Sequence, residues 1–374
     1  MSVWRIFGAS SHSTGSSSST CFPGSLRSSL PWGLALSWAN YWALVCGILT
    51  ERVISAVASY AMHPYRPRLS LAAWRDIVNF STWIWLVGIA RTVRERGTVM
   101  IVGGLLGPAQ VGIFAIGAEI ATLPESELIG PLARACFPGF AAARRAGMNV
   151  AESYLRIVAS TLLVATPASI GISSIAAPLV VLAFGSKWQA ATPVVAILAA
   201  SGVFTVITRI STVLLSASNM LRPVFWNVMT TSVVQFALLV LFARHRGIVG
   251  VAYAAALALV LEQTGLTIRT FHRFKIRPAG LLARIWRGLA ASAAMTAFLA
   301  LSGLGWRAVE GTFAADLRQL LLISGTGAAG YTCALLGLWL LSGKPDGPEA
   351  DILKLAERIA VRLRGLIGRG AAVL

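Results

Sequence analysis

Charged side chains are scarce in this chain of 374 residues. Asp, Glu, Lys and Arg together make up 12% of the sequence, whereas 56% of it is hydrophobic. So few polar groups cannot cover the surface of a water-soluble protein of this length. A surface that faces lipid removes the contradiction, because the outside of a membrane bundle can be as apolar as its core. The composition therefore predicts a membrane protein.

Cysteine and histidine are also rare, with four of each. The cysteines are isolated and the histidines are scattered, so we expect no disulfide and no metal site. The patterns G-x-S-x-G and H-E-x-x-H and clustered carboxylate pairs do not occur. Residues 325–330 match G-x-G-x-x-G, but they lie in an apolar run without a βαβ context, where small residues usually allow close helix packing. The sequence therefore predicts no enzyme activity, no catalytic residues and no cofactor.

Long apolar stretches joined by short connectors run through most of the sequence. A hydrocarbon core about 30 Å thick requires roughly 20 helical residues to cross it. The stretches are too long for strands, and they lack the alternation over about ten residues that a membrane β-barrel requires. We therefore predict an all-α, polytopic membrane helix bundle of about nine transmembrane helices. The expected spans are residues 40–62, 76–101, 111–136, 154–176, 192–215, 224–242, 248–271, 289–304 and 320–341.

Basic residues outnumber acidic ones, 32 Lys and Arg against 14 Asp and Glu, which gives a net charge of +18. In a soluble protein this charge would suggest nucleic-acid binding. Here the basic residues concentrate in the connectors after every second span, as the positive-inside rule requires of cytoplasmic loops. We therefore expect no nucleic-acid partner, cytoplasmic loops and a tail that attract anionic lipids, and a cytoplasmic C-terminus. The basic connectors contain Arg66, Arg68, Arg75, Arg134, Arg144, Arg145, Arg156, Arg222, Arg269, Arg273, Lys275, Arg277, Arg284 and Arg287.

The two ends of the chain differ from its apolar middle. Residues 1–37 contain a Ser-rich stretch of low complexity, which favours a disordered head; a transit peptide is the alternative. Residues 349–366 repeat apolar side chains every three or four positions, which predicts an amphipathic helix on the cytoplasmic head groups. We therefore divide the chain into a head (1–37), a first span (38–62), a bundle (63–342) and a cytoplasmic tail (343–374).

Several charged residues lie inside predicted spans, where such residues usually face the bundle interior. One hypothesis is that Arg91 and Arg94 line a cationic wall for an anionic substrate; the alternative is that the helix ends there and these residues are solvated. Arg91 and Glu95 are four residues apart, so they can pair along one helix face. Arg209 is either a cavity cation or half of a buried pair. Glu119 is either the partner of one of these arginines or a protonatable group.

Two further features of the spans are a lone acidic residue and several prolines. Glu262 is a lone charge that we expect to be structural, because lone charges near span ends can extend to the head groups. Proline occurs within or at the edges of apolar spans, where membrane helices bend. These prolines are Pro124, Pro131, Pro167 and Pro178.

A series of short motifs resembles the bacterial polysaccharide transporters. The most specific stretch, residues 119–140, reads EIATLPESELIGPLARACFPGF. The order and spacing of the motifs are similar to those of the Wzx-like flippases of lipid-linked oligosaccharides, whose superfamily also holds multidrug and toxin extruders and the murein lipid flippase. The resemblance covers residues 38–341. The supporting motifs are YWALV (41–45), PYRPRLS (64–70), GGLLG (103–107), VGIF (111–114) and FGSKW (184–188).

The resemblance implies a helical fold of two lobes that rock about a central cavity. The nine expected spans resemble helices 6–14 of such a flippase, which implies an N-terminally truncated chain with a missing N-terminal half as a partner. The implied function is flipping of polyprenyl-pyrophosphate-linked oligosaccharide repeat units across the bacterial inner membrane, for lipopolysaccharide or exopolysaccharide biosynthesis. Arg91, Arg94 and Arg209 would then bind the pyrophosphate or acidic sugars, and Glu119 would couple transport to an ion gradient.

Three alternatives stand beside this hypothesis. A drug or toxin extruder fits less well, because arginines suit anions better than cationic drugs. A membrane polymerase or ligase of the same pathway would need a large outside loop, and the predicted outside loops are short. The chain could also be a truncated remnant without transport of its own. One departure from the family pattern is Gly97-Thr98, where relatives often carry an acidic residue.

Overall fold

A computed structural model describes residues 49–50, 52–54, 57, 74–307, 312–343 and 347–349. The chain divides into two compact units, Met1–Ile77 and Val78–Leu374, and nearly all described residues lie in the second. The predicted head, most of the first predicted span and the predicted amphipathic tail helix lie outside the described residues.

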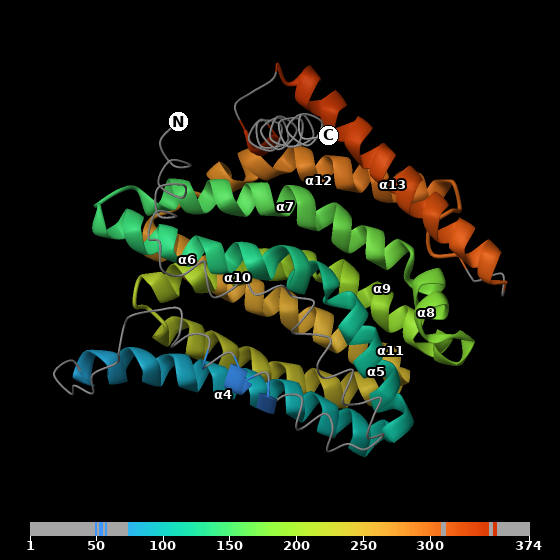
Figure 1. Ribbon diagram of the computed structural model, residues 1–374, viewed down its shortest axis with the longest axis horizontal. Coiled ribbons are helices and arrows are strands. Elements are labelled where there is room, and N and C mark those ends of the chain that lie inside the picture. Colours follow the sequence, from blue (N-terminus) through green and yellow to red (C-terminus); the bar gives the residue numbers. More distant parts are fainter. Residues whose placement is uncertain are drawn as a thin grey trace. The chain divides into compact units, whose positions relative to one another are not determined.

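Within the described part of the chain, every regular element is a helix, which confirms the predicted all-α class (Figure 1). Most of the described predicted spans lie within long helices, because a helix pairs all of its backbone groups internally, as an apolar surrounding requires. The elements are α4 (Trp74–Leu106), α5 (Pro108–Ala121), the π-helix η2 (Glu125–Ile129), α6 (Gly130–Arg145), α7 (Val150–Ser174), α8 (Ala176–Phe184), the 3₁₀-helix η3 (Ser186–Ala191), α9 (Thr192–Ser201), α10 (Val203–Ala217), α11 (Arg222–Phe274), α12 (Pro278–Leu301) and α13 (Phe313–Leu341).

Helix α11 is a hairpin of two predicted spans rather than one straight rod. Its 53 residues contain one non-helical position, Gly247, with φ 58° and ψ −137°. A side chain at Gly250 would lie 2.1 Å from the carbonyl oxygen of Phe242, so the turn leaves room for hydrogen alone. The two halves correspond to predicted spans 224–242 and 248–271.

Three described helices are long and apolar enough to cross a membrane: α7, α11 and α13. The pair formed by η3–α9 and α10, which is bent by 48° at Gly202, is a fourth such segment if it counts as one span. The chain is therefore a multi-pass membrane protein, and the total of nine spans stays a prediction.

Two predicted spans are broken in the structure. Predicted span 111–136 consists of α5, η2 and α6, with Pro124 directly before the π-helix and Pro131 in the first turn of α6. Predicted span 192–215 consists of α9 and α10. The first break coincides with Pro124 and Pro131, where a bend was expected because proline removes a backbone donor and its ring collides with the preceding turn. The second break lies at Gly202, where the sequence has no proline.

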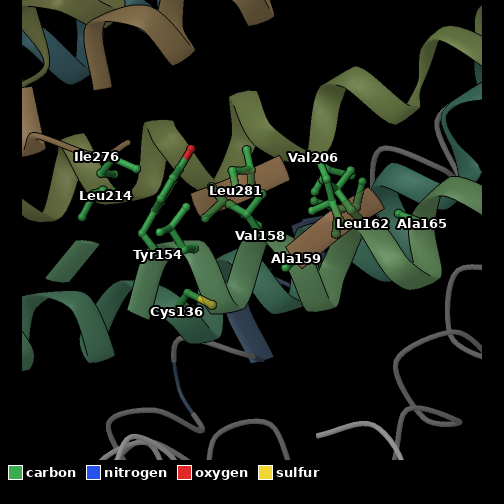
Figure 2. Packing of buried hydrophobic residues seen from close by; sticks show 14 of the residues in the cluster. Cys136, Tyr154, Val158, Ala159, Leu162, Ala165, Val206, Leu214, Ile276 and Leu281 are labelled. Atoms are coloured by element: carbon green, nitrogen blue, oxygen red, sulfur yellow. The ribbon is translucent and has the colours of Figure 1, made fainter. Parts of the chain in front are cut away.

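The largest core cluster joins α6, α7, α10, α11 and α12 (Figure 2). Tyr154 is fully buried, and its hydroxyl lies 2.8 Å from the hydroxyl of Ser211, which satisfies the one polar atom of the ring. Val158 and Leu162 follow Tyr154 on the same face of α7, four residues apart each time. This face fixes α7 against α10 and α12.

Glycines allow several helices to approach closely. A side chain at Gly117 would lie 2.6 Å from Val194, and one at Gly288 would lie 2.8 Å from Leu163. In the stretch 325–330, Gly327 and Gly330 have ordinary contact distances to side chains of α12. The stretch lies within α13, which supports the packing interpretation of the G-x-G-x-x-G match.

Helix α12 is joined to the segment after α13 by a buried ion pair. Arg287 donates from Nε to Glu349 Oε1 at 2.9 Å and from Nη2 to Oε2 at 3.1 Å. The two side chains are 6% and 4% exposed. Gly347 lies against both, because a side chain there would be 2.7 Å from Glu349 Oε2. Such a pair is bidentate and desolvated, so removing one partner leaves a buried charge.

We expect Glu349→Ala to lower the free energy of unfolding by about 3–5 kcal/mol, because it strands the Arg287 guanidinium. The measurement is denaturant unfolding of the purified protein in detergent. The matched control is Glu152→Ala, which removes a pair to Arg284 at 2.8 Å with side chains 56% and 31% exposed. The control should cost no more than about 1 kcal/mol. Equal losses of unfolding free energy in the two variants would contradict a stabilising role of the buried pair between Arg287 and Glu349.

Candidate functional site

Five charged side chains from four elements form one group, which we name the central charge cluster. Three are cations and two are anions, so the cluster carries one net positive charge. The elements are far apart in the sequence, and packing of α4 and α10 near α11 brings them together. The members are Arg91 and Arg94 on α4, Glu125 on η2, Arg209 on α10 and Glu262 on α11.

Glu262 is the most buried member, and its side chain is 4% exposed. Arg94 donates from Nη1 to Glu262 Oε2. Arg91 Nη2 lies 4.0 Å from the other carboxylate oxygen. The two arginines share a face of α4 because they are three residues apart. One carboxylate therefore neutralises part of the charge of two arginines.

Arg209 and Glu125 form the second ion pair of the cluster. Glu125 is the first residue of the π-helix η2, whose wider turn follows Pro124. The side chains are 39% and 25% exposed, so this pair is more accessible than the pair at Glu262. A π-turn is less regular than an α-turn, and such turns are frequent at functional sites.

Arg91 connects the two ion pairs. Its guanidinium interacts electrostatically with Arg94, Glu262, Arg209 and Glu125. Its Nε is buried without a hydrogen-bond partner among the described residues. Its side chain is nevertheless 25% exposed, and its carboxylate contact is the longest in the cluster. Arg91 is therefore the cation with the most capacity to bind an added anion.

Uncharged polar groups surround the cluster and fix its helices. Asn227 donates from Nδ2 to the main-chain oxygen of Glu262 at 2.9 Å. Gln235 donates to the hydroxyl of Thr98 at 3.2 Å, and Thr208 donates to Gln263 at 3.0 Å. These contacts join α4 to the first half of α11 and α10 to the second half. They satisfy polar side chains that would otherwise be costly in a lipid-surrounded bundle.

The structure brings three of the four predicted site residues together. Arg91, Arg94 and Arg209 all belong to the cluster, and α4 continues past them to Leu106, so the helix does not end there. Glu119 is exposed on α5 and does not belong to the cluster. The carboxylates that pair with the arginines are instead Glu125 and Glu262.

Sequence reasoning expected a structural role for Glu262 but misjudged its surroundings, since the side chain does not extend from a span end. It is 3% exposed and faces α4 from within the second half of α11. The signal that could have found it is its position: Glu262 and Gln263 interrupt an apolar run, and an ionisable residue inside a span usually faces the interior. Among the described residues, no group of three His, Cys, Asp or Glu side chains could hold a metal ion.

The described part of the chain has the fold of a helical membrane protein with charged residues buried between its helices, and a comparison with solved structures agrees for the fold. The chain is similar to the lipid II flippase MurJ in its inward closed conformation, with a TM-score of 0.63 and 13% identity. The similarity covers 90% of this chain and 70% of the flippase. At this identity the likeness shows the helical membrane fold alone.

Sequence comparisons find similarity to polysaccharide biosynthesis proteins. Residues 25–193 match the family described as polysaccharide biosynthesis protein, which confirms the predicted resemblance. The chain is 26% identical over 137 residues to the teichuronic acid biosynthesis protein TuaB of Bacillus subtilis (strain 168), covering 37% of this chain and 28% of that protein.

Two further relatives have names that point to transport or to surface polysaccharides. The succinoglycan biosynthesis transport protein ExoT of Rhizobium meliloti (strain 1021) is 23% identical over 175 residues, covering 46% of this chain and 35% of that protein. The lipopolysaccharide biosynthesis protein WzxC of Escherichia coli (strain K12) is 25% identical over 172 residues, covering 44% and 35%. The chain thus spans about a third of the length of the relatives that it matches.

We expect a double-mutant cycle to rank the two ion pairs of the cluster. The coupling free energy between Arg94→Gln and Glu262→Gln should exceed that between Arg209→Gln and Glu125→Gln, because the first pair is more buried and less screened. Couplings between contacting residues fall at about 0.5–3 kcal/mol. Denaturant unfolding in detergent measures all the variants. A larger coupling free energy between Arg209 and Glu125 would contradict the conclusion that the pair at Glu262 is the stronger of the two.

Proposed function

We propose that this chain takes part in translocating polyprenyl-pyrophosphate-linked oligosaccharides across the bacterial inner membrane, for lipopolysaccharide or exopolysaccharide biosynthesis. The observation that carries the proposal is the central charge cluster, with three arginines and two carboxylates inside a helical membrane bundle. A pyrophosphate is a compact anion of high charge, and arginine is the side chain best suited to bind its oxygens. The names of the relatives and the similarity to a lipid flippase support the same substrate class.

The cluster offers a physical route to a transport cycle. A pyrophosphate that approaches Arg91 competes with Glu262 and Glu125 for Arg94 and Arg209. Each exchanged pair removes a link between two elements, α4 and α11 in one case and η2 and α10 in the other. A ligand that binds one arrangement more tightly than the other shifts the population toward it. Rocking-type alternating access follows if the freed elements move, and the bends at Gly202 and at the π-helix provide suitable hinges.

The remaining parts of the proposal concern coupling and surroundings. Glu119, exposed on α5, is the candidate for coupling transport to an ion gradient. The basic connectors and the tail would contact anionic lipids of the cytoplasmic leaflet, and the C-terminus would then be cytoplasmic.

The alternative functions differ in the ligand that they require. A drug or toxin extruder needs a site for cations, and the net positive cluster would repel them. A polymerase or ligase would use a reactive group beside its substrate, whereas the cluster residues of the described chain are engaged in ion pairs. A remnant without transport would keep the pairs for stability alone.

We expect Arg91→Gln to reduce flipping about tenfold or more, since a charge-assisted hydrogen bond contributes about 1.5–3 kcal/mol. The assay places the chain in liposomes with a fluorescent prenyl-pyrophosphate oligosaccharide, and measures how much label becomes accessible to a membrane-impermeant quencher. The matched control is Arg96→Gln, an exposed arginine on the same helix, which should leave the rate unchanged. An added cationic dye should not compete.

Two outcomes would contradict the proposal. If the wild-type chain moves the label no faster than empty liposomes do, the chain has no flippase activity of its own. If Arg91→Gln and Arg96→Gln are equal, or if the dye competes, the cluster is not the pyrophosphate site. Thermal unfolding of both variants in detergent should first show that their folds are equally stable.

Membrane orientation has a separate test. We expect Lys275→Cys, between α11 and α12, to react with an impermeant thiol reagent after the cells are permeabilised but not before. Arg246→Cys, beside the turn at Gly247, should react in intact cells, because the turn lies at the opposite end of each half of α11. Both positions are exposed, and the native cysteines are first replaced by serine. The reverse pattern would overturn the cytoplasmic assignment of the basic connectors.

A further inference from the structure

A second cation-rich site lies outside the central charge cluster, at the ends of α10 and α11. It is a cavity of about 700 Å³, which we name the basic pocket. This volume lies within the range of about 300–1,000 Å³ that small-molecule sites occupy. The side chains that matter for the argument are Trp83, Arg222, Pro223, Arg269, His272 and Arg273.

The charge of the basic pocket is of one sign. Arg222, Arg269 and Arg273 are fixed cations, His272 can become one, and none of the described residues that line the pocket is acidic. The simplest explanation is membrane topology, together with the preference of basic residues for the last turn of a helix, where α11 ends at Phe274. That explanation accounts for the composition of the pocket but not for the arrangement of its arginines.

Arg269 is held in place by uncharged partners. Its Nη1 donates to Asn227 Oδ1 at 2.7 Å and to the main-chain oxygen of Pro223 at 3.2 Å. Neither partner neutralises the guanidinium, in contrast to the carboxylates that pair with Arg94 and Arg209. The side chain is therefore ordered and still carries its full positive charge toward the pocket.

Arg222 is ordered by an aromatic surface. Its guanidinium carbon lies 5.9 Å from the ring centre of Trp83, and Trp83 in turn makes an edge contact with Phe225 at 5.7 Å. The pocket wall also includes the first turn of α11, which has no side-chain cap among the described residues. The positive end of this helix adds to the attraction for an anion.

A hydrogen-bonded path connects the basic pocket to the central charge cluster. Asn227 accepts from Arg269 and donates to the main-chain oxygen of Glu262. Arg269 and Glu262 lie seven residues apart on one half of α11, a rise of about 10 Å. A side chain at Gly265 would be 2.4 Å from Asn227 Oδ1, so glycine is required there for the path to exist.

We propose that the basic pocket binds the phosphate groups of a lipid-linked pyrophosphate before these groups reach the central charge cluster. This inference rests on the proposed function, and it adds a loading site that is separate from Arg91. Arg222 and Arg273 are the exposed cations that first contact the ligand, and Arg269 is the fixed cation nearest to the path. An anionic phospholipid offers the same phosphate chemistry, so the experiment must separate the two sources.

The test uses the full chain in phosphatidylcholine nanodiscs and two probes, inorganic pyrophosphate and a prenyl pyrophosphate without sugar. We expect the double variant Arg222→Gln/Arg273→Gln to bind both probes about tenfold or more weakly, because each lost charge-assisted hydrogen bond contributes about 1.5–3 kcal/mol. The matched control is Arg244→Gln/Arg246→Gln, which removes the same charge from exposed positions at the end of the first half of α11, beside the turn at Gly247. The control should bind both probes as tightly as the unaltered chain.

Equal affinities in the two double variants would overturn the pocket as a phosphate site. Nanodiscs that contain phosphatidylglycerol separate the sources: unchanged prenyl pyrophosphate binding supports the loading site, whereas full displacement would overturn the loading role and leave a phospholipid site. Failure of the proposed function gives a different result from failure of the loading site. In that case the wild-type chain would still bind pyrophosphate through Arg222 and Arg273, but it would move no lipid-linked oligosaccharide. Equal thermal unfolding of both double variants confirms that neither result reflects misfolding.

Discussion

The buried carboxylate of Glu262 determines how the helices around it are arranged. An ionised side chain inside a membrane bundle requires opposite charges, and α4 supplies them through Arg94 and Arg91. This requirement sets the rotation of α4, since the face with the arginines must point toward the second half of α11. Val87, Ala90 and Val102 consequently pack in the two apolar clusters that join these helices. Breaking the pair would leave a buried charge without a partner, so the pair opposes other rotations of α4.

The arginines of the central charge cluster and Arg269 of the basic pocket have partners of different kinds. Arg94 and Arg209 have carboxylate partners, which an incoming anion must displace. Arg269 has amide and carbonyl partners, which leave its charge available. Under the proposed function, an anion would bind the basic pocket without displacing a carboxylate, whereas binding in the central charge cluster would be coupled to rearrangement. Transport requires both capture of the ligand and a change of conformation.

Two irregular features of the described chain, the π-helix η2 and the bend at Gly202, lie in or next to the elements that carry the pair of Glu125 and Arg209. The π-helix η2 positions Glu125 toward Arg209, and the bend at Gly202 separates α9 from α10, which carries that arginine. Both elements lie in segments that a hydropathy pattern describes as single spans. Hydropathy reports the average polarity of a window and is insensitive to the loss of one backbone hydrogen bond. The prolines indicated bends in this region, but the kind of turn they produce depends on the helices packed against them.

The sequence alone determined the membrane class, the helical fold and the presence of buried arginines, because each follows from local composition and from the length of the bilayer. It also carried the motifs that matched the polysaccharide biosynthesis family. The partners of the arginines could not be predicted, since Arg94 meets Glu262 across 168 residues and Arg209 meets Glu125 across 84. The interpretation of Glu262 as a peripheral charge failed for the same reason. Which charges meet depends on how the helices are rotated and packed, and tertiary structure alone decides that.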